Sequence, residues 1–185
     1  MNESRRKFLT FATGAIAGVG AVLASIPFVK SMNPPKHIKQ KTWDIDFAKL
    51  RPGQLMVHVV ESKPIFIALR TKEDLEGLDI DNNKLKDPDS EESDQPELSK
   101  NKYRSIEPEI FVAEGLCTHL GCSPAHVKSD QDFLPPKATG GYFCPCHGAV
   151  YDSAGRVLKG GPAPRNLRVP VYEFIEDRKI RISPS

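Results

Sequence analysis

Two short segments rich in cysteine and histidine carry the side chains that could bind a metal. Residues 117–122 read CTHLGC and residues 144–148 read CPCHG, and together they hold all four cysteines and two of the five histidines. Each segment offers one Cys and one His in the same order, as Cys-x-His and then Cys-x-x-His, with one further cysteine left over. Two thiolates and two imidazoles that converge on one point predict a metal site.

Zinc and an iron–sulfur cluster are the two centres that this donor set suits. Structural zinc commonly takes two Cys and two His, but it gives no reason for the two additional cysteines. A [2Fe–2S] cluster usually has four Cys ligands, but in one type two His replace two Cys on one iron. Cys117 and Cys144 would then bind one iron, and His119 and His147 the other. Because neutral imidazoles leave the cluster less negative, its potential rises from about −400 mV to about −150 to +300 mV.

The remaining cysteines, Cys122 and Cys146, fit a disulfide that ties one segment to the other. It would close about 25 residues and contribute roughly 3–4 kcal/mol by loop-closure entropy. A disulfide requires an oxidising compartment, whereas iron–sulfur clusters are usually assembled in the cytoplasm. A protein with both features is expected to be exported after it has folded around its cluster.

The two motifs resemble those of the Rieske iron–sulfur family, in particular the iron–sulfur subunit of quinol–cytochrome c oxidoreductase, the cytochrome bc complex. The similarity extends through Tyr151 to residues 161–164, which resemble the family's proline loop over the cluster, and it includes the N-terminal segment. The resemblance implies one Rieske-type [2Fe–2S] cluster in a mainly β protein. The implied fold is a Rieske-type antiparallel β-sandwich with an inserted cluster-binding subdomain near residues 110–165, plus one N-terminal transmembrane helix.

One position departs from the family pattern. High-potential members usually carry Ser directly after CPCHG, where its hydroxyl hydrogen-bonds a cluster sulfur, but this chain has Ala149. Tyr151, which resembles the family's second donor to the cluster, is retained. Because hydrogen bonds to the sulfurs stabilise the reduced cluster, Ala149 predicts a lower potential. Menaquinol, a stronger reductant, therefore becomes a candidate substrate beside ubiquinol.

The resemblance also implies a function, that of the electron-transfer subunit of a membrane quinol–cytochrome c oxidoreductase. His147 would be the catalytic residue that hydrogen-bonds the quinol and receives one electron and a proton, with His119 as the second exposed ligand. The electron would then pass to a c-type cytochrome. The alternative is the Rieske subunit of another exported oxidoreductase, such as an arsenite oxidase.

The expected partners are a cytochrome b subunit, which holds the quinol pocket, and a c-type cytochrome subunit, together in a dimeric complex. An apolar tip around the imidazoles would dock into the quinol pocket. The residues expected to form this docking tip are Leu120, Gly121, Pro145 and Pro162.

The N-terminus has the features of an export signal and a membrane anchor. Residues 4–9 read SRRKFL and resemble a twin-arginine signal, which directs already folded proteins across the membrane. The charge-free stretch from Phe8 to Val29 would span about 33 Å as a helix, enough to cross a bilayer. Since a cleaved signal has a shorter apolar core, we predict an uncleaved anchor at residues 1–29. The chain would cross the bacterial inner membrane once, with its head domain in the periplasm.

The rest of the chain predicts a tether and a head domain. Residues 30–40, with Pro34 and Pro35, predict an extended tether, and in the family this segment is a hinge. Residues 41–185 predict one mostly β head domain, in keeping with 16 prolines and 13 glycines in the chain. A helix is expected to begin at Thr71, and residues 123–137 to form a connection. Strands are expected at 42–47, 55–60, 65–69, 109–116, 168–175 and 179–182.

Charge and the remaining histidines carry less information about function. With 26 basic and 24 acidic side chains the net charge is +2, which argues against a nucleic-acid partner. The acidic residues 79–108 predict a solvated surface excursion, with a docking face for a basic cytochrome c as the alternative. His37, His58 and His126 lack cysteine neighbours and are predicted to be surface or packing residues.

Overall fold

The computed structural model describes residues 2–32 and 41–183. The chain divides into two compact units, Met1–Lys39 and Gln40–Ser185. Most of the predicted tether, from position 33 to position 40, lies outside the described residues, and so do Pro34, Pro35 and His37.

The first unit consists of one helix, α1 (Glu3–Ser31), which has 29 residues. Its length and apolar composition are sufficient to cross a membrane, since the stretch from Phe8 to Val29 is helical throughout and covers about 33 Å. None of the residues in α1 is buried, so side chains such as Phe11 are available for contact with lipid or a partner. The helix continues to Ser31, two residues past the predicted boundary of the anchor.

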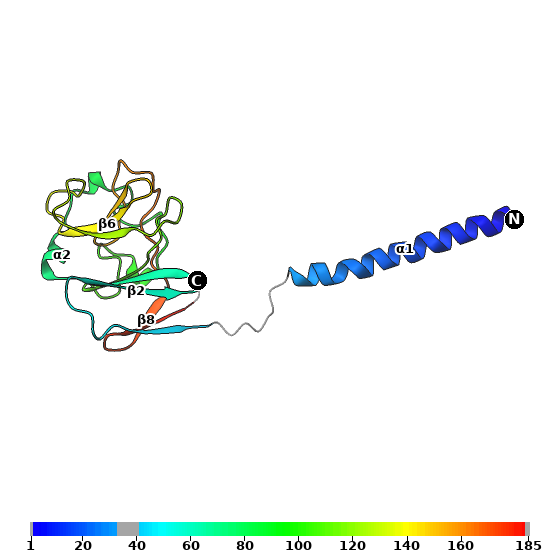
Figure 1. The fold of residues 1–185 in the computed structure, drawn as a ribbon, viewed down its shortest axis with the longest axis horizontal. Helices are drawn as coiled ribbons and strands as arrows, with labels where there is room; N and C mark the ends of the chain where they lie inside the picture. Colours follow the sequence, from blue (N-terminus) through cyan, green and yellow to red (C-terminus); the bar gives the residue numbers. More distant parts are fainter. Residues whose placement is uncertain (1, 33–40, 184–185) are drawn as a thin grey trace. The chain divides into compact units, whose positions relative to one another are not determined.

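The second unit contains three antiparallel sheets of three strands each (Figure 1). The first sheet has the order β1 (Trp43–Asp46), β9 (Lys179–Ile182), β8 (Tyr172–Glu176). The second has the order β2 (Gln54–Val60), β3 (Lys63–Leu69), β4 (Ile110–Glu114). The third has the order β5 (Ala125–Lys128), β6 (Gly140–Cys144), β7 (Ala149–Asp152). The mainly β head that the sequence predicts is therefore confirmed.

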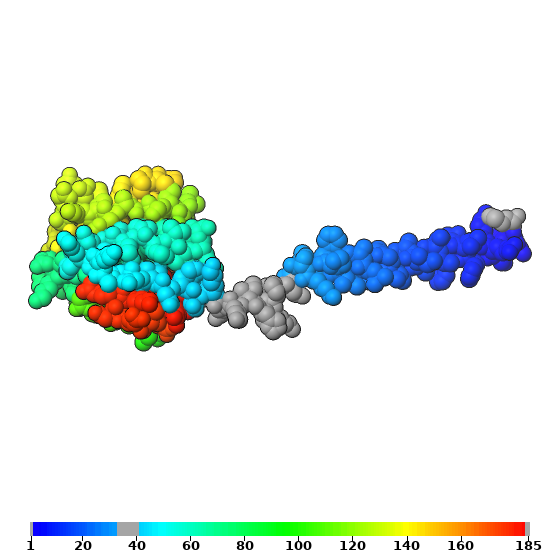
Figure 2. All heavy atoms as spheres, turned by 60° about the horizontal axis from the view of Figure 1, so that its bottom comes forward, coloured from blue at the N-terminus to red at the C-terminus, as the bar shows by residue number. Residues whose placement is uncertain are grey.

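The first sheet pairs strands from the two ends of the head domain. β1 and β9 run antiparallel, with Ile45 opposite Ile180. Figure 2 shows the C-terminal strands (red) against the early strands (cyan) on one continuous surface. This pairing joins the first and the last strand of the head domain in one sheet.

In the middle sheet, β3 and β4 are buried on both faces, because they contribute alternate residues to two hydrophobic cores. Ile67 and Val112, which are register partners, belong to the core shared with the first sheet. Phe66 and Phe111 belong to the core shared with the third sheet, which also contains Tyr142. Burial on two faces explains why these strands are continuous apolar runs rather than alternating ones. The third sheet, which carries the second metal-binding segment, therefore packs against the buried strands β3 and β4.

Local predictions for the first half of the head hold with small shifts. The β2–β3 hairpin turns at Glu61 and Ser62, which both have positive φ, so β3 begins at Lys63 rather than Ile65. The helix α2 (Lys72–Glu76) begins with a capping box, in which the Thr71 hydroxyl and the Asp74 carboxylate each accept from the other's backbone N–H. The predicted connection 123–137 contains the unpredicted strand β5, whose polar, mostly exposed residues form a strand only by pairing with β6.

The prediction that residues 79–108 form a solvated surface excursion holds for most of the acidic side chains, but part of the segment is buried. Two short 3₁₀ helices, η1 (Asn82–Lys84) and η2 (Glu97–Ser99), lie within it. The Asp87 side chain is buried and accepts hydrogen bonds from the backbone N–H groups of Glu91 and Glu92 and from the Ser93 hydroxyl. A carboxylate that gathers several donors can be buried without an ion pair. Eight of the nine acidic residues in the segment do face solvent, namely Asp79, Asp81, Asp89, Glu91, Glu92, Asp94, Glu97 and Glu107.

Candidate metal centre

Both metal-binding segments form the same type of tight loop. The first follows β4 and the second connects β6 to β7. In the first loop the N–H of Gly121 donates to the carbonyl of Cys117 at 2.9 Å, and in the second the N–H of Gly148 donates to the carbonyl of Cys144 at 2.9 Å. Both glycines have positive φ, +81° and +74°, a conformation that other residues rarely adopt. The two loops therefore hold Cys117 and Cys144 at equivalent positions of the same turn, whereas His119 lies two residues and His147 three residues after its cysteine.

The four predicted ligands separate into a buried pair and an accessible pair. The Cys117 and Cys144 side chains are 3% and 2% exposed. Burial raises the pKa of the Cys144 thiol, and a hydrogen-bonding interaction with Cys117 raises it further, so the two sulfurs are neighbours. The rings of His119 and His147 lie with their centroids 4.7 Å apart and nearly perpendicular, His119 half-buried and His147 exposed. Two buried thiols and two paired imidazoles fit the donor set of a Rieske [2Fe–2S] cluster.

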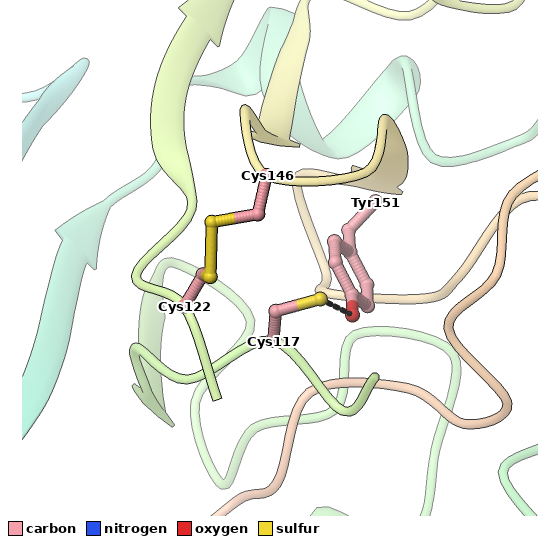
Figure 3. The surroundings of a disulfide bond; sticks show 4 residues. All are labelled: Cys117, Cys122, Cys146 and Tyr151. Carbon is pink, nitrogen blue, oxygen red and sulfur yellow. Dashed lines mark hydrogen bonds between the residues drawn. A yellow bond between two sulfur atoms is a disulfide. The ribbon is translucent and has the colours of Figure 1, made fainter. Parts of the chain in front are cut away.

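The other two cysteines form the predicted disulfide. Cys122 and Cys146 are bonded, with their Cα atoms 6.6 Å apart (Figure 3). The sulfurs of Cys122, Cys144 and Cys146 lie within 4.8 Å of one another. Because two of these sulfurs are bonded to each other, only Cys144 of this group retains a thiol for iron. The disulfide links the two loops directly beside the ligands.

Tyr151 lies beneath the first loop and hydrogen-bonds a predicted ligand. Its hydroxyl donates to Cys117 Sγ at 3.2 Å (Figure 3) and accepts from the backbone N–H of Thr118 at 3.1 Å. The side chain is fully buried on β7. Burial, and next the contact with Cys117, raise the pKa of Tyr151 above its ordinary value. The hydroxyl therefore remains protonated and available as a donor to sulfur.

Replacing Tyr151 by phenylalanine is expected to lower the reduction potential of the centre. The change removes a donor to Cys117 Sγ, and hydrogen bonds to the sulfurs stabilise the reduced, more negative state. A redox titration followed by EPR measures the shift. Tyr142→Phe is the matched control. Tyr142 lies opposite Tyr151 on the same sheet and is equally buried, but its ring packs against Phe66 of β3. Equal potentials for the two variants would contradict the assigned role of Tyr151.

Ala149 is the first residue of β7 and lies between the second loop and the proline loop, which we define as residues 160–164. Its side chain is fully buried. A Cβ added at Gly161 would lie 3.2 Å from Ala149 Cα and 3.4 Å from the carbonyl oxygen of Gly148. The proline loop therefore packs directly on the residue where the family usually has serine.

Ala149→Ser is expected to raise the reduction potential, because the added hydroxyl supplies the sulfur donor that this chain lacks. The same redox titration checks the shift. Val150→Thr is the control, since it adds a hydroxyl on the opposite face of β7 and leaves the cluster side unchanged. An unchanged potential in Ala149→Ser would refute the proposed effect of this position.

The four residues of the predicted docking tip are exposed. Leu120 is 72% exposed at the end of the first loop. Gly121, Pro145 and Pro162 are exposed as well.

Sequence reasoning missed three groups that support the site. Asp152 and Arg156 form a buried ion pair, with Arg156 Nε 2.6 Å from Asp152 Oδ2, and Arg156 also donates to the carbonyl of Leu78 at 2.6 Å. Their spacing around a four-residue turn could have indicated this pair. Thr118 Oγ1 donates to the Arg165 carbonyl at 2.6 Å. The third group, the contact of Lys86 with the proline loop, has no sequence signal.

The remaining described histidines lie outside the centre. His58 is exposed on β2, an edge strand. The His126 ring lies 5.5 Å from that of Tyr142, and burial lowers the pKa of His126. Both positions agree with the predicted surface or packing roles.

Comparisons with known proteins agree with the geometry of the site. A model described as "Ubiquitinol-cytochrome C reductase Fe-S subunit TAT signal" matches residues 1–35, and the Rieske [2Fe-2S] domain model matches residues 92–173. The ubiquinol-cytochrome c reductase iron-sulfur subunit of Allochromatium vinosum is 42% identical, covering 98% of this chain and 89% of that protein. The corresponding subunit of Bradyrhizobium diazoefficiens is 38% identical, covering 98% and 95%.

One similar solved structure is a chain of a hyperthermophilic respiratory Complex III, with a TM-score of 0.46 and 26% identity over 92% of this chain and 98% of that chain. The sequence relatives decide the family, because they match nearly the full length of the chain at 38–42% identity. With a Rieske [2Fe–2S] domain over the two ligand loops, the chain belongs to the family of Rieske iron–sulfur subunits of ubiquinol–cytochrome c reductase.

Proposed function

We propose that this chain is the electron-transfer subunit of a membrane quinol–cytochrome c oxidoreductase, and that it carries an electron from quinol to a c-type cytochrome. The observation that carries the proposal is the 42% identity to such a subunit over 98% of the chain. The arrangement of the two ligand loops supports it. The alternative, the Rieske subunit of an arsenite oxidase, is not favoured by these relatives.

The proposed ligands are Cys117 and Cys144 for one iron and His119 and His147 for the other. When bound there, a [2Fe–2S] cluster supplies one-electron redox chemistry at a potential raised by its two imidazole ligands. The buried thiols exclude water from the cysteine side of the site. The accessible imidazoles leave the other side open to a substrate.

His147 is the proposed catalytic residue, because its imidazole is the more exposed of the two. With one ring nitrogen on iron, the other would be free to hydrogen-bond a quinol hydroxyl and to hold its proton. A more negative metal centre strengthens the hold of this nitrogen on the proton. Electron and proton uptake from the quinol would thereby be coupled at one side chain, with the half-buried His119 as the second proposed imidazole ligand.

The proposed docking tip consists of four exposed residues, Leu120, Gly121, Pro145 and Pro162. These residues lie in the two ligand loops and the proline loop. An apolar surface of this kind suits an apolar quinol pocket, because its burial there is favourable. We propose that the tip enters the quinol pocket of a cytochrome b subunit.

The proposed arrangement in the membrane follows from the N-terminus. Residues 1–29 anchor the chain in the bacterial inner membrane, residues 30–40 act as the hinge, and residues 41–185 form the head on the periplasmic side. A match to a TAT-signal model and a disulfide in the head both support export of the folded domain to an oxidising compartment. The proposed partners are a cytochrome b and a c-type cytochrome in a dimeric complex.

Affinity purification of the full-length chain from its native membranes tests the function. Co-purification of b- and c-type haems, an EPR signal of a reduced mixed-ligand cluster and quinol-dependent cytochrome c reduction are the expected results. Assays with ubiquinol and menaquinol analogues in parallel identify the substrate, which the alanine at position 149 leaves undecided. A colourless protein with stoichiometric zinc and no iron would refute the proposal.

A further inference from the structure

The proline loop (residues 160–164) is held in place by side chains of other segments. Within the described part of the chain, no backbone N–H of residues 160–165 donates to a backbone carbonyl. Pro162 and Pro164 have no N–H to donate. Instead, the Gly161 and Ala163 carbonyls accept hydrogen bonds from Lys86 Nζ, both at 2.7 Å. The position of the loop therefore depends on a side chain that lies 75 residues earlier in the sequence.

Lys86 extends from a part of the acidic segment that is itself firmly packed. Its backbone N–H donates to the Val157 carbonyl at 3.0 Å, and the preceding Leu85 is buried and bridges to Leu158. The following residue, Asp87, is the buried carboxylate of the segment. The Lys86 side chain thus extends to the loop from a backbone position whose two neighbours, Leu85 and Asp87, are both buried.

The same segment also holds the chain that leaves the proline loop. Asn166 Nδ2 donates to the Asp87 carbonyl at 2.8 Å and to Ser90 Oγ at 3.0 Å, and the N–H of Asn166 donates to Ser93 Oγ at 3.0 Å. All of these atoms are buried. Residues 86–93 therefore contact the proline loop itself through Lys86, and they contact Asn166, just past its C-terminal end, through three further residues.

The position of the loop matters for the metal centre because Gly161 packs on Ala149 and on the Gly148 carbonyl. Gly148 and Ala149 directly follow His147, and Gly148 belongs to the same loop as Cys144. A displaced proline loop would uncover this side of the ligand loop to water. It would also displace Pro162 from the proposed docking tip.

We propose that Lys86 is a positioning residue that keeps the proline loop closed over the cluster. Its ammonium group holds the carbonyls of Gly161 and Ala163, in a loop that forms no backbone–backbone hydrogen bond within the described part of the chain. The inference rests on the proposed cluster ligands, and it assigns a function to the acidic segment that the charge pattern alone does not suggest.

Lys86→Met tests this role, because methionine is of similar length and lacks both the charge and the donors. Lys84→Met is the matched control. Lys84 is exposed two residues earlier, and within the described residues its side chain forms no hydrogen bond or ion pair. Both changes remove one positive charge from the same short segment, so a difference between them reports the loss of the anchor. The full-length chain with its cluster, purified in detergent, is the sample.

In Lys86→Met, bleaching of the visible cluster absorbance in the presence of an iron chelator is expected to be about tenfold faster than in Lys84→Met, equivalent to about 1.4 kcal/mol. Deuterium modulation of the EPR signal of the reduced cluster in D₂O should increase, because water reaches the site. The far-UV thermal melting of the head should change equally in both variants. Lys86→Arg, which retains charge and donors, should restore the wild-type bleaching rate.

Equal bleaching rates and equal deuterium modulation in Lys86→Met and Lys84→Met would overturn the proposal. If Lys86→Met does not fold, Lys86→Gln, which removes the charge and shortens the side chain but keeps an amide N–H group, is compared with Lys84→Met by the same criteria. If the wild-type chain shows no EPR signal of a mixed-ligand cluster, the proposed ligand set fails instead, so the two failures are distinguishable.

Discussion

Replacing His147 by alanine is expected to give a folded head domain without its cluster. The imidazole of His147 is one of a facing pair at 4.7 Å, and its loss leaves one iron with an incomplete set of ligands. Mutation of residues that only support a metal ligand already costs about 10–100-fold in affinity or activity. Loss of the ligand itself should therefore lower quinol–cytochrome c reductase activity by more than about 100-fold. Cys144→Ser should give the same result.

Iron and acid-labile sulfide content, with the visible spectrum, measure this loss directly on the purified full chain. The wild type should contain about two of each per chain. His126→Ala is the matched control, since His126 packs against Tyr142 on the cluster sheet but outside both ligand loops. It should keep its full iron content. Full iron occupancy in His147→Ala would mean that the ligand set is wrong.

The second large effect is expected from removal of the disulfide. Cys122→Ser combined with Cys146→Ser removes a bond between residues 24 positions apart, and the loop-closure model assigns such a bond about 3–4 kcal/mol. This bond also holds the two ligand loops together. The double variant should therefore lose its cluster much faster than the wild type, by at least about tenfold in half-life at a fixed temperature.

The wild-type protein supplies the control for this experiment. Treatment with a strong thiol reductant under argon should accelerate the loss of iron from the wild type but not from the double variant; iron content is the measure, because the reductant also reduces the cluster in both proteins. A double variant whose half-life equals that of the untreated wild type would show that the ligand loops are held without the disulfide. The single variants are less suitable, because each leaves a free thiol beside the ligands.

The metal centre was largely predictable from the sequence because its chemistry is local. Each loop contains a thiol, an imidazole, an additional cysteine and a turn glycine within five or six consecutive residues. The left-handed conformation of Gly121 and Gly148 is what such a tight loop requires. The Cys122–Cys146 pairing was also predictable, since no other cysteines remain once the ligands are assigned. The helix α1 follows from a long charge-free stretch alone.

The acidic segment shows where sequence reasoning stops. Its composition predicts solvation, yet Asp87 and Arg104 are buried. The burial of Arg104 depends on acceptors brought in from elsewhere, such as the backbone carbonyls of Ala154 and Gly155. No pattern within residues 79–108 contains that information. The charge of the segment therefore predicted its exposure to solvent but not which of its residues pack against the rest of the domain.

The sequence by itself determined which atoms could bind iron, which cysteines could pair and which stretch could enter a membrane. Each of these properties depends on residue type and short-range spacing. Only the tertiary structure decided what holds those atoms in place, namely Tyr151 beneath Cys117 and Lys86 on the proline loop. These contacts join residues 34 to 77 positions apart, and they exist because the packed sheets bring those segments together.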